Sequence, residues 1–107
     1  MNEAKQYVTY TPAADILESG NGWTMLMDLP GVPDKALSVD VENNVLKVSG
    51  ESELSEKDMA VRYERSFTLS DEVDTGKINA KLANGVLELS LPKAESAQPR
   101  KIQVLSA

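Results

Sequence analysis

The stretch Leu82-Ala83-Asn84-Gly85-Val86-Leu87-Glu88-Leu89-Ser90-Leu91-Pro92 predicts a β-hairpin that specifies its own register. Asn-Gly between two apolar runs is a strong hairpin signal, because a two-residue type I′ turn needs positive φ at both central residues. A hairpin about this dipeptide gives three apolar cross-strand pairs on one face: Leu82 with Leu87, Ala80 with Leu89, and Ile78 with Leu91. The pairs on the opposite face are polar: Lys81 with Glu88, and Asn79 with Ser90. A slip of one residue would exchange the two faces.

The chain repeats this arrangement about Asn43-Asn44, since asparagine tolerates positive φ better than most residues. The apolar pairs of this second hairpin are Val41 with Leu46 and Val39 with Val48. Its polar pairs are Asp40 with Lys47 and Ser38 with Ser49. Two hairpins with the same logic strengthen the prediction of an antiparallel β protein.

Alternating apolar residues predict further strands at 23–29 and 61–69, and residues 12–18 read as a short edge strand. Pro33 to Ala36 is long enough for a single helical turn. Residues 51–58 are heavily charged and are interpreted as a solvated loop, with an arm that orders against a partner as the sharper alternative. Residues 1–11 are mostly polar and are interpreted as a frayed terminus. Arg65 falls on the apolar face of its strand, so it needs a partner or lies at an edge or interface.

The pattern of six or seven strands, frequent turns and no amphipathic helix is typical of an all-β sandwich. The 107 residues suit one domain. Eleven basic and 17 acidic residues give a net charge of −6, which argues against nucleic acid and anionic membranes as partners. No apolar run approaches a transmembrane span and Met1 to Lys5 lead into no signal-peptide segment, so a cytoplasmic protein is expected.

Histidine and cysteine are both absent from the chain. A thiol nucleophile, a disulfide, the usual general base and the commonest zinc ligand are therefore missing. The sequence also lacks the Gly-x-Ser-x-Gly, phosphate-loop and EF-hand spacings. We therefore expect no catalytic activity, no metal and no cofactor.

Ile102 and Val104 form an apolar pair at the end of a polar linker, residues 93–100. Such a pair suits insertion into a groove, on this chain or another, or pairing with a sheet edge. A final strand of the chain's own domain is an equal alternative at this point.

Five short motifs occur in an order that resembles the small heat shock proteins of the Hsp20 or α-crystallin family. They are Leu29-Pro30-Gly31-Val32, Glu64-Arg65-Ser66-Phe67, Ala83-Asn84-Gly85-Val86-Leu87, Leu91-Pro92-Lys93 and Ile102-Gln103-Val104. The resemblance implies an immunoglobulin-like sandwich of seven to eight strands, the α-crystallin domain, at residues 12–93. A short flexible arm at 1–11 and a C-terminal extension at 94–107 would flank it. The implied function is an ATP-independent holdase that binds partly unfolded client proteins.

The resemblance also implies three interaction surfaces. Dimers would form by exchange of residues 52–59 onto a partner's residues 14–17, and the implied interface residues are Ala14, Ile16, Leu17, Leu54, Met59 and Arg65. The tail motif of Ile102 and Val104 would dock into a neighbour's groove, which is lined by Val39, Val41, Ile78, Ala80 and Leu82. The client-binding arm would use Tyr7, Val8 and Tyr10.

Two departures from the family pattern concern assembly. The exchange loop, residues 51–60, is short, and the N-terminal arm has few apolar residues. We therefore expect a homodimer, extended to a small assembly or to co-assembly with a longer-armed relative. The alternatives are a CS-domain-like co-chaperone adaptor and a plain protein-binding β-sandwich, and the Ile-x-Val tail favours the small heat shock protein over the first.

Overall fold

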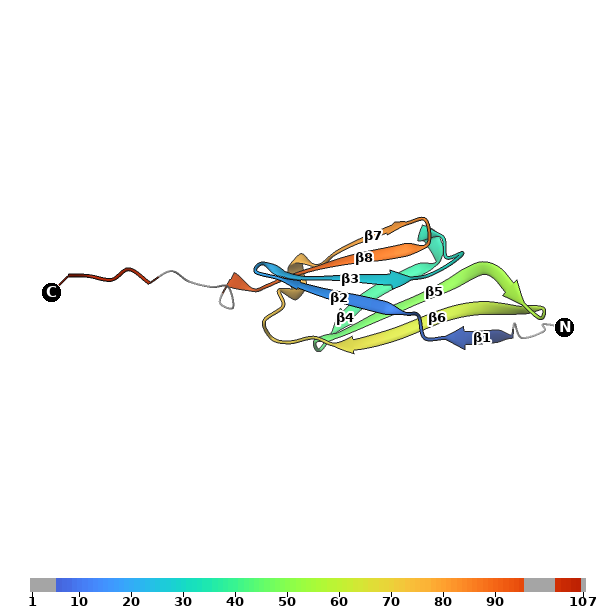
Figure 1. Ribbon diagram of the computed structural model, residues 1–107. Helices are drawn as coiled ribbons and strands as arrows, with labels where there is room; N and C mark the ends of the chain where they lie inside the picture. Colours follow the sequence, from blue (N-terminus) through green and yellow to red (C-terminus); the bar gives the residue numbers. More distant parts are fainter. Residues whose placement is uncertain (1–5, 96–101, 107) are drawn as a thin grey trace.

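The computed structural model describes residues 6–95 and 102–106, and in them it places two four-stranded sheets face to face (Figure 1). One sheet has the strand order β1-β6-β5-β4 and the other β2-β3-β8-β7. All pairings are antiparallel except that of β1 with β6, which is parallel. The elements are β1 (Tyr7–Tyr10), β2 (Ala14–Ser19), β3 (Gly22–Asp28), η1 (Asp34–Ala36), β4 (Leu37–Glu42), β5 (Val45–Glu56), β6 (Met59–Thr68), η2 (Thr75–Lys77), β7 (Asn79–Ala83) and β8 (Val86–Pro92). The predicted all-β sandwich is confirmed.

Both predicted hairpins form in the expected register. Asn84 and Gly85 have φ of 52° and 76°, and Asn43 and Asn44 have φ of 52° and 63°. The β7–β8 ladder joins Leu82 to Leu87 and Ala80 to Leu89, but it ends at Asn79 with Ser90. The predicted pair of Ile78 with Leu91 therefore lies outside the ladder, because Ile78 is still the C-cap of η2. All four predicted pairs of the β4–β5 hairpin are present.

The core lies between the inner faces of the two sheets. Alternate residues of β3, β5 and β8 supply it, as the period of two requires. Its fully buried side chains are Met25, Met27, Leu29, Leu46, Val48, Leu87 and Leu89. The edge strand β7 contributes less, since Leu82 is half-buried and Ala80 is exposed.

The charged segment 51–58 is not the predicted loop. β5 continues to Glu56, turns at Lys57 and Asp58 with φ of 49° and 64°, and returns as β6. The ladder resumes at Ser55 with Ala60 after an irregularity that begins at Glu51. This tip of the hairpin, residues 52–60, extends past the sandwich (Figure 1), and residues 53–58 are exposed, so their sequence shows no apolar alternation. We call it the arm.

A buried serine anchors the arm to the domain. Ser52 is 7% exposed, and its hydroxyl donates to the carbonyl oxygen of Pro30 over 2.8 Å. The same hydroxyl accepts from the backbone N–H of Leu54 over 3.0 Å. Gly31 lies against it with φ of 77°, and a Cβ there would stand 2.3 Å from the Ser52 oxygen. A glycine is needed at this contact on both grounds.

The prediction of a frayed terminus is wrong for Tyr7–Tyr10, which form β1. β1 runs parallel to the start of β6, from Tyr7 beside Ala60 to Tyr10 beside Tyr63. Tyrosine, valine and threonine favour strands, but a four-residue strand needs an edge to pair with. The arm supplies that edge, and the sequence of residues 1–11 alone cannot show it.

Candidate functional site

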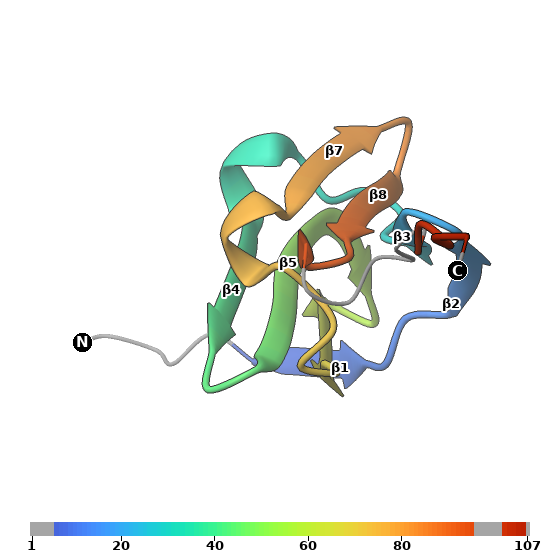
Figure 2. The same cartoon turned by 90° about the vertical axis from the view of Figure 1, so that its left-hand side faces the viewer.

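β4 and β7 are the edge strands of the two sheets on one side of the sandwich (Figure 2). A hollow between them is lined by Asp34, Leu37, Ala80, Leu82 and Leu87. Of the five predicted groove residues, Ala80 is exposed. The other four are half-buried: Val39, Val41, Ile78 and Leu82. Ala80 and Leu82 line this hollow, whereas Val39, Val41 and Ile78 pack against the core beside it, so a groove that uses all five residues stays a prediction.

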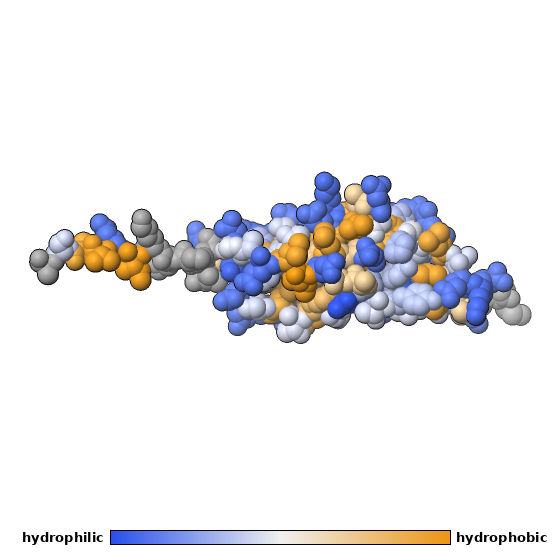
Figure 3. All heavy atoms as spheres, viewed as in Figure 1, coloured by the Kyte–Doolittle hydropathy of each residue, from blue (hydrophilic) through white to orange (hydrophobic). Residues whose placement is uncertain are grey.

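The tail motif lies open to solvent. Ile102 is 84% exposed and Val104 is 89% exposed. Leu105, which the sequence analysis passed over, is 81% exposed and makes the tail a run of three large apolar side chains in four residues. Residues 102–106 belong to neither sheet, so the alternative of a final strand in the domain is not formed. Figure 3 shows this apolar tail beyond the domain.

The opposite side of the sandwich presents β2, which pairs with β3 on one edge and with no described strand on the other. Ile16 and Leu17 are 53% and 59% exposed. They point to opposite faces of the strand, so both faces carry uncovered apolar surface. Of the other predicted dimer residues, Leu54 on the arm is 58% exposed, and Ala14 and Met59 are half-buried.

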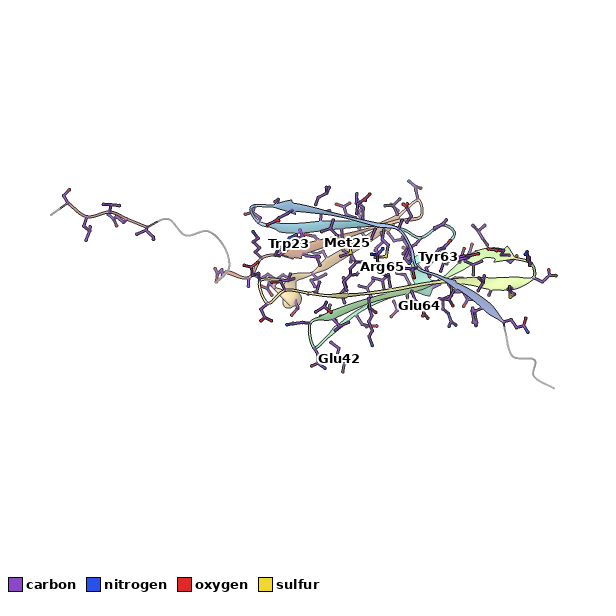
Figure 4. The ribbon with its side chains drawn as sticks, turned by 60° about the horizontal axis from the view of Figure 1, so that its bottom comes forward. Trp23, Met25, Glu42, Tyr63, Glu64 and Arg65 are labelled. Carbon is purple, nitrogen blue, oxygen red and sulfur yellow. The ribbon has the colours of Figure 1, made fainter. Side chains whose placement is uncertain are left out.

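Arg65 lies at the edge between the two sheets, as its position on the apolar face predicts. Its Nη1 donates to the carbonyl oxygen of Pro12 over 2.8 Å, and its guanidinium lies 4.7 Å from the ring centroid of Phe67. Figure 4 shows it between the sheets, near the tyrosine of the same strand, Tyr63. Arg65 is thus half-buried, and its hydrogen bond and aromatic contact offset the free-energy cost of removing the charge from water.

An apolar hollow that the sequence analysis did not find opens between β2 and the end of β6. Its lining residues come from both sheets and the loop after β6: Ile16, Trp23, Met25, Phe67, Thr68, Leu69, Ser70, Val73 and Leu91. Figure 3 shows apolar surface on the face that β2 crosses. Alternation assigned Trp23, Met25 and Phe67 to the core, and only the spacing of the two sheets at this edge leaves a gap between them.

The three residues predicted to bind clients, Tyr7, Val8 and Tyr10, belong to β1. The hydroxyl of Tyr10 donates to Glu56 Oε2 over 2.5 Å, and that of Tyr7 to Glu51 Oε2 over 3.4 Å. The guanidinium of Arg62 lies 3.7 Å from the Tyr7 ring centroid. The third residue, Val8, is half-buried beside Val61. These residues therefore bind the arm in the structure as it stands.

The Tyr10 contact predicts a loss of β1 at alkaline pH. The hydrogen bond to Glu56, with smaller effects of desolvation and of that negative charge, raises the pKa of Tyr10 above its ordinary value of 10.0. A raised pKa means that the contact stabilises β1 up to that ordinary value and that this stability disappears as the pH rises through the folded pKa. Tyrosinate absorbance of the wild type should therefore include one tyrosine that titrates above its ordinary pKa and that is missing from Tyr10→Phe. The contact would be contradicted if the tyrosine that Tyr10→Phe lacks titrated at its ordinary pKa.

Comparison with protein-family models matches residues 15–105 to the Hsp20/alpha crystallin family. The chain belongs to this family. Spore protein SP21 of Stigmatella aurantiaca is 37% identical to it over 108 residues, which cover 92% of this chain and 64% of that protein. Small heat shock protein C2 of Rickettsia felis is 31% identical and is matched over 87% of this chain and 67% of its own length. The chain thus spans 64% and 67% of the length of these two relatives.

Solved structures agree with this assignment to the Hsp20/alpha crystallin family. A small heat-shock protein from Xylella fastidiosa superposes with a TM-score of 0.70 at 29% identity, over 91% of this chain and 98% of that one. HspA from Xanthomonas axonopodis gives 0.66 at 29% identity, over 78% and 94%. The recognition of a small heat shock protein from five sequence motifs is confirmed, and its family is one of stress-response chaperones.

No group of three or more histidine, cysteine, aspartate or glutamate side chains in residues 6–95 and 102–106 is placed to hold a metal ion. Within the same residues, no helix is long and apolar enough to cross a membrane.

Proposed function

We propose that the protein is an ATP-independent holdase that binds partly unfolded chains in the cytoplasm and limits their aggregation. The observation that supports the proposal is the exposed apolar tail at residues 102–105, together with a hollow between β4 and β7 lined by Leu37, Ala80, Leu82, Leu87 and Asp34. Membership of the Hsp20/alpha crystallin family supports the chaperone function. No bond is made or broken in this mechanism, which needs only competition for apolar surface.

In this proposal Ile102 and Val104 dock into the groove of a neighbouring subunit. Burying apolar surface contributes about 25 cal/mol per Å², so two such side chains contribute a few kcal/mol before the cost of ordering the linker. A contact of that strength is reversible. Stress exposes apolar segments of clients, which then compete with the tail for the groove residues Val39, Val41, Ile78, Ala80 and Leu82.

The proposed building block is a homodimer that uses the side opposite the groove. The free edge of β2 offers unpaired backbone groups and two exposed apolar side chains, Ile16 and Leu17. The arm carries Leu54, which is also exposed, and Met59 at the start of β6. A partner's arm laid along β2 would cover both sets, with Ala14 and Arg65 at the border of the contact.

The test is an aggregation assay in the absence of ATP. A heat-labile enzyme is warmed with increasing amounts of the protein, and its light scattering is followed. We expect scattering to fall as the protein is added and to be unaffected by ATP. An equal mass of an unrelated acidic protein is the control, because net charge alone keeps proteins apart. Unchanged scattering at a several-fold molar excess would exclude general holdase activity.

A further inference from the structure

β1 is held on the protein by few contacts. It has four residues, and in the described part of the chain it pairs with β6 alone. Tyr7 and Val8 are half-buried, whereas Thr9 and Tyr10 are exposed. β1 lies along the arm, outside the face-to-face part of the sandwich (Figure 1). A strand with one short ladder and little buried surface opens far more readily than the core.

Two tyrosine–carboxylate contacts fasten β1, one on each face of the sheet. Tyr7 and Tyr10 are three positions apart, so their side chains leave the strand on opposite faces. Each hydroxyl reaches across β6 to a carboxylate of β5, Glu51 for Tyr7 and Glu56 for Tyr10. β1 is therefore held by one hydrogen bond on each face of the sheet, and water can take the place of either partner in these bonds.

β1 covers part of an open sheet edge. β6 has ten residues, and β1 pairs with residues 60–63 of them. Residues 64–68 have no strand on that side among the residues that the structure describes. A row of unpaired backbone groups is a template for another extended segment. Opening of β1 would lengthen this template to the whole outer edge of β6.

The apolar hollow between β2 and β6 lies beside the uncovered half of this edge. Phe67 and Thr68 belong to both the edge and the hollow lining, and Ile16 and Trp23 form the opposite wall. Peptide recognition by strand addition uses backbone bonds for affinity and such pockets for alternate side chains. The two features together form a site for an extended segment with an apolar side chain.

We propose that the outer edge of β6, residues 60–68, binds an extended apolar segment of an unfolding client, and that β1 occupies this edge in cis until the client displaces it. β1 itself shows what fits, since it is an extended segment with two aromatic residues on a short tether. The inference rests on the proposed holdase function. It adds a binding site on the side of the sandwich away from the tail groove, next to the proposed dimer surface, with which it shares Ile16.

A disulfide lock tests the proposal, because the chain has no cysteine of its own. Val8→Cys with Val61→Cys joins paired residues of β1 and β6. Thr24→Cys with Ser90→Cys joins paired residues of β3 and β8 and is the matched control for oxidation. The probes are a fluorescent peptide of residues 6–11 (QYVTYT) and a reduced, carboxymethylated lactalbumin as a chain that stays unfolded.

We expect the oxidised lock to bind both probes at least about tenfold more weakly than its reduced form, because the covalent bond removes the open state. The oxidised control should bind them as its reduced form does. Tyr7→Phe with Tyr10→Phe acts in the opposite direction. It removes both hydroxyl–carboxylate contacts and should tighten binding about fivefold.

Equal probe binding by the oxidised and reduced lock would overturn the proposal, as would unchanged binding by the double phenylalanine variant. If the lock instead lowers the mass in solution and leaves probe binding unchanged, the occupant is β1 of a second copy and the client assignment is wrong. A wild type that binds the probes but suppresses no heat aggregation contradicts the proposed holdase function and leaves the β6 site supported.

Discussion

Leu89→Ala is expected to lower the free energy of unfolding by about 3 kcal/mol, within the range for large-to-small changes in rigid cores. Leu89 is 0% exposed at the centre of β8, where it pairs with Met25 of β3 on one side and with Ala80 of β7 on the other. Ladders on both sides hold the backbone of β8 in place, so the neighbours cannot close the cavity. Denaturant unfolding followed by tryptophan fluorescence at one protein concentration measures the loss.

Val86→Ala is the matched control for this substitution. Val86 begins the same strand but is 38% exposed, and its change to alanine should cost less than about 1 kcal/mol. Similar losses for the two variants would mean that the middle of β8 is no better packed than its start, contrary to the structure.

Ile102→Ala combined with Val104→Ala is expected to shift the assembly to smaller species. Each side chain contributes about 1.5–3 kcal/mol when fully buried, so removal of both should weaken tail docking by about a hundredfold after the cost of ordering is counted. The exposure of both side chains in the isolated chain, 84% and 89%, leaves this surface available to a groove. Multi-angle light scattering over a dilution series measures the change in mass.

Gln103→Ala is the control for the tail, because it lies between the two apolar positions and is exposed without being a large apolar residue. We expect it to retain the mass of the wild type. A wild type larger than a dimer whose mass is unaffected by the double substitution would show that the tail does not hold the assembly together. The groove would then need a different occupant.

Local chemistry was enough to predict both hairpins with their registers. Asn84-Gly85 and Asn43-Asn44 accept the positive φ of a two-residue turn, and the period of two then leaves one register that buries Leu87, Leu89 and Val48. The sandwich follows from these hairpins, since their apolar faces must be covered. The sequence also predicted that Arg65 needs a partner or a position at an edge, because a charge falls there on the apolar face of a strand.

The arm and β1 were not predictable in the same way. A two-stranded arm that extends past the sandwich leaves residues 53–58 exposed, so residues 51–58 carry charges on both sides and resemble a loop. β1 forms because the arm offers it an edge and because Glu51 and Glu56 accept its tyrosine hydroxyls. These partners are more than 40 positions away in the chain, at separations of 44 and 46 residues.

For the candidate sites, the sequence motifs predicted individual residues, and the structure shows where these residues lie. Of the predicted groove residues, Ala80 and Leu82 line a hollow beside β4, whereas the hollow at Trp23 and Phe67 was not predicted. The sequence by itself determined the two hairpins, the alternating core strands and the apolar tail, because these depend on neighbours within a few residues. Only the tertiary structure decided which edges stay open and which strand covers β6, because an edge is defined by what two distant segments leave unpaired.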